Sequence, residues 1–165
     1  MQFNISSFVT VAHLNLRKQG DEDDRELAID VKVKAEGVQP SVLVPIVGAD
    51  SVDDIMRAFY DKKGEDVLFT GITQVESWAE FKSRHTLTIA GFTVYPEAIK
   101  KFKFRPRAPD KRPAADIEFS FTLLEPDRDL VRYLTDNVAE AVHIDIQGEP
   151  ELDFGAGSET EQEAS

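Results

Sequence analysis

The chain has 165 residues, 41% of them hydrophobic and 30% charged, with a formal net charge of −12. That length supports one domain with a buried core and is short for two, and the lack of cysteine excludes disulfides, thiolate nucleophiles and thiolate metal sites. No secretory leader begins the sequence, and no stretch approaches the ~18 consecutive apolar residues of a membrane span, so we expect a cytoplasmic protein with no membrane partner.

Alternation of apolar and polar residues predicts a long hairpin near the N-terminus. Residues 9–16 alternate but change phase near residues 12 and 13, which indicates a strand with a bulge. Residues 27–35 alternate without a break. The polar link between the two strands carries Asp21, Glu22, Asp23 and Asp24, so we expect an acidic tip.

The next segment predicts a helix between extended stretches. Residues 41–47 are apolar, but Pro45 confines them to an edge or a bulge of a sheet. Asp50 or Ser51 can cap a helix whose apolar face includes Ile55, and Gly64 is expected to end it. From residue 67 to residue 91 the pattern is extended again.

The second half of the chain predicts more strands and one further helix. Residues 117–123 alternate strictly, a helix follows Pro126 with an apolar stripe of Leu130, Leu134, Val138 and Ala141, and residues 142–146 form a last strand. With strands outnumbering helices, the predicted fold of residues 1–148 is mainly β (α+β): an antiparallel β-sandwich or a partly open barrel with two packed helices.

Positive charge is concentrated in one stretch of this acidic chain. The cations are Lys100, Lys101, Lys103, Arg105, Arg107, Lys111 and Arg112. Alternation puts Lys101, Lys103 and Arg105 on one face of a strand and Phe102 and Phe104 on the other. The plainest interpretation is a pair of core phenylalanines beneath a solvated lysine face.

A functional interpretation of the same stretch is a nucleic-acid interface. Three prolines make residues 105–113 a stiff, extended loop, and cations arranged along a strand and such a loop can follow a phosphate backbone. Binding of single strands also uses aromatic side chains on which bases stack. Phe92, Tyr95 and Trp78 are the candidates, although such residues are more often part of a core.

Residues 149–165 carry six acidic residues and no basic one. A segment of this composition cannot bury enough apolar surface to order itself, so we expect a disordered acidic tail. It can serve solubility, cover the basic stretch when nucleic acid is absent, or offer residues 152–154 to a partner.

A β-rich domain with a basic strand and loop and an acidic C-terminal tail resembles phage and bacterial single-stranded-DNA-binding proteins. The stretches SFVTVAHLNLRKQG and DDRELAIDVKVKAEG also resemble small uncharacterised proteins of tailed phages. The resemblance implies a phage-encoded protein that binds single-stranded DNA in the host cytoplasm. Tails of those binding proteins commonly end on an apolar residue beside acids, whereas this chain ends on Ser165 and holds Phe154 further inside.

The sequence offers no converging groups for catalysis or metal binding. His13, His85 and His143 are isolated, and no metalloprotease, nucleophile-elbow, P-loop or dinucleotide motif is present. His143 and Asp145 would share one side of a strand as a surface pair, and residues 21–24 lack the EF-hand order. We therefore expect no enzyme activity, metal or cofactor.

Two other functions fit the same sequence. The acidic residues 21–24 or the tail could take the place of DNA phosphates and bind a host nuclease or defence complex, which would make the chain an inhibitory DNA mimic. Alternatively, its sheet edges could pair with copies of itself in a virion or assembly component, as a homo-oligomer.

Overall fold

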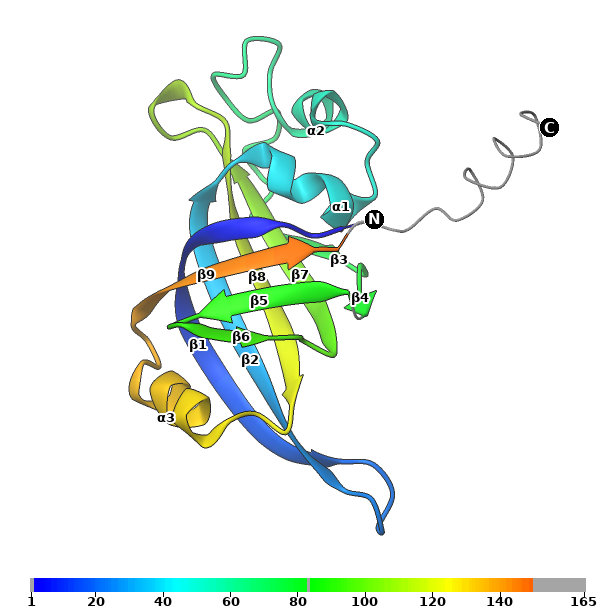
Figure 1. The fold of residues 1–165 in the computed structure, drawn as a ribbon. Coiled ribbons are helices and arrows are strands. Elements are labelled where there is room, and N and C mark those ends of the chain that lie inside the picture. The colour runs from blue at the N-terminus through cyan, green and yellow to red at the C-terminus, as the bar shows by residue number, and fades with distance from the viewer. Residues whose placement is uncertain (1, 83, 150–165) are drawn as a thin grey trace, which may run out of the picture.

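The computed structural model describes residues 2–82 and 84–149, and these form one open antiparallel sheet of nine strands (Figure 1). The sheet order is β3-β7-β8-β2-β1-β9-β5-β6, with β4 also pairing with β7. The strands are β1 (Ile5–Gln19), β2 (Glu26–Val38), β3 (Val75–Ser77), β4 (Phe81–Lys82), β5 (His85–Ile89), β6 (Phe92–Val94), β7 (Ala98–Arg107), β8 (Ala114–Leu124) and β9 (Ala141–Gly148). The predicted mainly β, α+β class is confirmed.

Strand β1 belongs to both layers of the molecule. Its first part pairs with β9 up to Thr10, and its second part pairs with β2 from Thr10 onward. The register against β2 shifts between Val11 and His13, which confirms the predicted bulge. Because a bend of this kind lets a strand pass from one layer to another, β9, β5 and β6 cross in front of β2, β8 and β7 (Figure 1). One continuous sheet therefore folds over itself.

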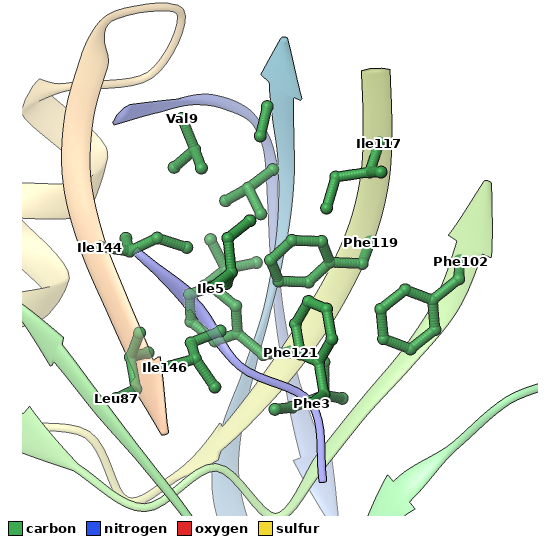
Figure 2. Packing of buried hydrophobic residues seen from close by; sticks show 14 of the residues in the cluster. Phe3, Ile5, Val9, Leu87, Phe102, Ile117, Phe119, Phe121, Ile144 and Ile146 are labelled. Atoms are coloured by element: carbon green, nitrogen blue, oxygen red, sulfur yellow. The ribbon is translucent and has the colours of Figure 1, made fainter. Parts of the chain in front are cut away.

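The core lies between these two layers. Figure 2 shows Ile144, Ile146 and Leu87 from one layer pointing toward phenylalanines of the other. The ring of Phe3 packs edge-on against the rings of Phe102 and Phe119, with centroids 5.1 and 5.2 Å apart. Phe102 and Phe104 are buried, as their alternation with lysine predicts.

Three α-helices lie in the described part of the chain, where two were predicted: α1 (Leu43–Val47), α2 (Val52–Phe59) and α3 (Arg128–Asp136). The segment assigned to a sheet edge is helical instead, as a short 3-10 turn, η1 (Pro40–Val42), that runs into α1. Pro45 fits there because it lies in the first turn of α1, where backbone N–H groups lack partners within the helix. None of the helices described is long and apolar enough to cross a membrane.

The ends of the two predicted helices also need correction. Helix α2 stops at Phe59 because Tyr60 pairs in a β-bridge with Val67, and Gly64 lies in the turn between them. Helix α3 buries Leu130 and Leu134, but it ends at Asp136, before Val138 and Ala141. Residues 68–74, predicted to be extended, form turns and irregular backbone with no strand.

A candidate nucleic-acid interface

A bulge in β7 brings its lysines to one face. The register against β8 shifts between Lys100, opposite Ser120, and Lys103, opposite Glu118. Lys101 is the extra residue and has a left-handed φ of 60°. Lys100 and Lys103 therefore both point to the outer side of the sheet, so the cationic face is wider than simple alternation predicts.

We call the outer side of β2, β8 and β7 the basic face. Its cations come from two strands: Lys32, Lys34, Lys100, Lys101, Lys103, Arg105 and Arg107. Strand β8, between them, contributes carboxylates, and Glu118 lies 2.8 Å from the Nζ of Lys32 and 3.8 Å from that of Lys34. The basic face is thus positive along its two sides and mixed in the middle.

Two of the seven predicted site residues are ion-paired. Lys103 lies 3.7 Å from Glu76 of β3, and Arg107 lies 2.9 Å from Asp116 of β8. The hydrogen bond to Asp116 and the charge of that carboxylate raise the pKa of Arg107. Partly exposed pairs of this kind contribute ~0–1 kcal/mol each, so a phosphate can compete for both cations.

The other five predicted residues are more available. Within the described part of the chain, no carboxylate pairs with Lys100, Lys101, Arg105, Lys111 or Arg112. Lys101 and Arg105 are exposed on the sheet, and Lys111 and Arg112 are exposed at the end of the β7–β8 hairpin. All five can reach a ligand without breaking an ion pair.

Two neighbouring hollows follow the basic face. The larger, of about 350 Å³, is lined by residues of β1, β2, β7 and β8 that include His13, Lys32 and Lys101. The smaller, of about 190 Å³, includes Lys34 and Arg105 in its lining. Lys103 and Glu118 line both hollows, so together they make a shallow groove across the strands.

The β7–β8 connection is a compact turn, not the stiff, extended loop that its three prolines predict. Strand β7 continues through Arg107 and β8 begins at Ala114, so six residues join them, with a single 3-10 turn, η2 (Pro109–Lys111). Asp110 and Lys111 both have left-handed φ values, of 52° and 59°. Two successive left-handed residues suit the twist of a tight hairpin, which explains why the chain reverses so quickly.

Tyr60 holds the β7–β8 hairpin next to its turn. Its hydroxyl donates a hydrogen bond to the carbonyl oxygen of Ala114, the first residue of β8. The side chain is buried, and burial raises the pKa of Tyr60 to about 12.

The three predicted stacking residues differ in exposure. Trp78 is 100% exposed and Tyr95 is 70% exposed, whereas Phe92 packs against the core. Trp78 directly follows β3, the edge strand that pairs with β7, so it lies beside the basic face. Its exposure is the main feature of this surface that composition and alternation do not indicate.

The β1–β2 hairpin carries the predicted acidic tip. It extends from the body at the opposite end of the molecule from the β7–β8 turn (Figure 1). Asp21, Glu22, Asp23 and Asp24 are all exposed. No group of side chains that could hold a metal ion occurs among the residues described.

Two of the three histidines, His85 and His143, make contacts within the fold. His85 is buried, and its Nε2 accepts a hydrogen bond of 3.1 Å from the backbone N–H of Phe3. His143 packs edge-on against the exposed ring of Phe8, with centroids 5.1 Å apart. Asp145 accepts a hydrogen bond from Gln147 at 3.3 Å, whereas the Nε2 of His143 lies 3.5 Å from the hydroxyl of Ser6.

Comparison of the chain with models of known protein families, with curated proteins and with solved structures gave no match. The sheet and the basic face by themselves define the class: a mainly β protein with a cationic outer face. The predicted acidic tail, except Glu149, lies outside the described residues.

Proposed function

We propose that this chain binds single-stranded nucleic acid, specifically DNA, on the basic face and on the β7–β8 turn. The observation that carries the proposal is the bulge at Lys101, which adds Lys100 to the face of Lys103 and Arg105 beside the lysines of β2. Phosphates spaced along a strand would replace the counterions of these side chains. The exposed indole of Trp78 at the edge of the same face would stack on a base.

Two cations of the proposed interface, Lys101 and Lys111, occupy left-handed backbone positions, where a residue with a Cβ costs roughly 1–2 kcal/mol and glycine costs little. Arg84, Ala90, Glu125 and Ala139 are left-handed too and lie outside the interface, so strain alone does not mark a site. Both lysines are exposed, so packing does not demand lysine at either position, and contact of the cationic side chain with a ligand would explain the choice.

Removing four of the five unpaired cations tests the site. In a variant with Lys101→Gln, Arg105→Gln, Lys111→Gln and Arg112→Gln, we expect weaker binding of a fluorescein-labelled single-stranded oligonucleotide in fluorescence polarisation. The slope of log affinity against log salt should fall by about 3, since each phosphate contact on a single strand contributes about 0.7. Duplex DNA of the same sequence serves as the competing ligand.

A matched control carries the same charge change elsewhere. Lys18→Gln, Arg25→Gln, Arg128→Gln and Arg132→Gln remove four exposed positive charges from the β1–β2 hairpin and from α3, away from the β7–β8 turn (Figure 1). This control should bind single strands as the unmodified protein does. An equal loss in both variants, or an affinity that does not depend on salt, would contradict the proposal.

Trp78 separates single strands from duplex. Trp78→Ala should cost about 1–3 kcal/mol of binding to single strands, the usual contribution of one base stacked on an aromatic ring. Duplex binding should not change, because paired bases are not available for stacking. A Tyr95→Ala control, at the other exposed aromatic residue, shows whether the effect belongs to this edge.

A second function is favoured by the position of the acidic tip. The exposed carboxylates of residues 21–24 stand clear of the body and could bind a basic host protein, such as a nuclease, in place of DNA phosphates. Under that alternative, changing these residues to Asn and Gln would abolish inhibition of a purified nuclease. Under the proposed function, it would leave DNA binding intact.

A further inference from the structure

An apolar hollow lies beside Trp78. It measures about 520 Å³ and is lined by residues 45–48 of α1 and its C-terminal end and by residues 75–79 of β3 and the following loop, with Phe104 also contributing. Val47 on its wall is 39% exposed, and Trp78 is fully exposed. On this side β3 pairs with no other strand in the described chain. A bare apolar hollow beside an unpaired edge strand is a surface that an extended segment can cover.

The described chain ends close to this hollow. The backbone N–H of Glu149 donates to the carbonyl oxygen of Arg84 at 2.7 Å. The side chain of Gln2 donates to the carbonyl oxygen of Glu149 at 2.6 Å, and the neighbouring Phe3 packs with its ring 5.1 Å from that of Phe102. Phe102 lies opposite Ser77, the residue before Trp78. Residues 150–154 can span about 16 Å when extended, and their side chains add to that reach.

The sequence that follows Glu149 matches the hollow and its surroundings. Leu152 and Phe154 alternate with Glu151 and Asp153. In an extended segment the two apolar side chains therefore share one side and the two carboxylates share the other. If the apolar side faces the hollow, the acidic side is free to meet the lysines of β7, the strand next to β3.

We propose that Leu152 and Phe154 dock in the hollow beside Trp78, within the same molecule. The remaining glutamates of the tail then lie near the cations of β7. Nucleic acid must displace the tail before a base can stack on Trp78; this competition rests on the proposed function, whereas the docking does not.

The single tryptophan of the chain reports on the docking directly. An indole in water emits at longer wavelength than one covered by apolar groups. The full chain should therefore emit at shorter wavelength than a chain that ends at Glu149. A synthetic peptide of residues 149–165, added to the shortened chain, should restore the shift in a saturable manner.

Point variants locate the contact while keeping the reporter. Leu152→Ser with Phe154→Ser in the tail, and Val47→Asp on the wall of the hollow, should each abolish the shift. Glu159→Gln with Glu161→Gln is the matched tail control and should retain it. Equal emission from the full and shortened chains would overturn the proposal, as would a shift that depends on protein concentration, because that would indicate contact between molecules.

The two proposals fail in different ways. If the emission shift is present but neither chain binds an oligonucleotide, docking stands and the nucleic-acid function is wrong. If the shift is absent and both chains bind with equal affinity, the function stands and docking is wrong. If both are correct, the shortened chain and the Phe154 variant should bind single strands more tightly than the full chain, and an oligonucleotide should change the emission of both.

Discussion

The two longest hairpins of the molecule have the same construction and opposite charge. The β1–β2 and β7–β8 hairpins are both antiparallel and both interrupted by a bulge, at residues 11–13 of β1 and 100–103 of β7. The first ends in four successive acidic residues, and the second ends in Lys111 and Arg112. They reach opposite ends of the molecule (Figure 1).

The difference lies in where the charge sits relative to the sheet. The run of four acids in the first hairpin lies in its turn, beyond the last paired residues, Gln19 and Glu26, whereas its strands carry acids and bases together. The cations of the second line the strand itself and continue into the turn. An anionic ligand can therefore lie along β7 and the neighbouring lysines of β2, whereas a cationic partner meets concentrated negative charge only at the tip of the first hairpin. The net charge of −12 gives no indication of this separation of charge. The local electrostatic potential, not the net charge, guides an approaching ligand.

The largest expected effect tests whether the two hairpins fold as one unit. Phe119 of β8 packs against Phe3, which precedes β1, and against Phe102 of β7. Phe119→Ala should lower the free energy of unfolding by about 3–5 kcal/mol, because it opens a cavity shared by both hairpins. Chemical denaturation should still show one transition. Phe8→Ala, at an exposed ring, should change stability by less than ~0.5 kcal/mol, and a second transition in the Phe119 variant would contradict shared folding.

A smaller effect is expected where the hairpins join. Asp30 of β2 accepts hydrogen bonds from Arg17 of β1 at 2.8 Å and from Thr122 of β8 at 2.6 Å. Partial burial by itself would raise the pKa of Asp30, but the hydrogen bonds from Arg17 and Thr122 outweigh it and lower the pKa. Asp30→Asn should cost about 1–3 kcal/mol at neutral pH.

The pH dependence of that effect has a definite sign. Because the folded protein holds the pKa of Asp30 below its unfolded value, the contribution is complete above the unfolded pKa and is lost as pH falls through the folded one. Denaturant titrations in the acid range should show a shallower loss of stability in the Asn variant. Parallel curves for the two proteins would refute the role of this carboxylate.

The smallest effect on stability is expected beside the turn of the β7–β8 hairpin. Tyr60→Phe removes the hydrogen bond to Ala114 and should cost about 1 kcal/mol. Burial raises the pKa of Tyr60 to about 12, above its usual value of about 10, so its contribution is complete below pH ~10 and is lost as pH rises toward 12. The Phe variant should lose less stability in that range. Tyr95→Phe, at an exposed ring, should behave as the unmodified protein does.

Strands with one buried face were predictable from sequence, because burial imposes a period of two. Residues 29–35 of β2 and 117–121 of β8 show that period, and the phase change in β1 revealed its bulge. The bulge in β7 left the same signal. Ile99 and Phe102 are both buried and three residues apart, an odd spacing that alternation does not allow. The basic face was therefore predictable in outline; Lys100 was included among its candidate cations, but alternation did not place it on the same side of the strand as Lys103 and Arg105.

Features set by contacts between distant segments were not predictable. Helix α1 has five residues, too few for a helical period to appear, and its stability depends on packing of Leu43 and Ile46 against the core. The exposure of Trp78 follows from its place after an edge strand, which sequence pattern does not reveal. The ion pairs of Lys103 and Arg107 depend likewise on strand order, which was not assigned.

The pairing of β1 with β9 sets a condition on folding during synthesis. Ile5 lies opposite Ile146, so the strand that joins the two layers waits for a partner that is synthesised long after it. Translation of the intervening residues takes on the order of ten seconds. For that time the apolar side of the N-terminal strand has no β9 to cover it, and a nascent chain stalled before residue 141 would be a target for chaperones or proteases.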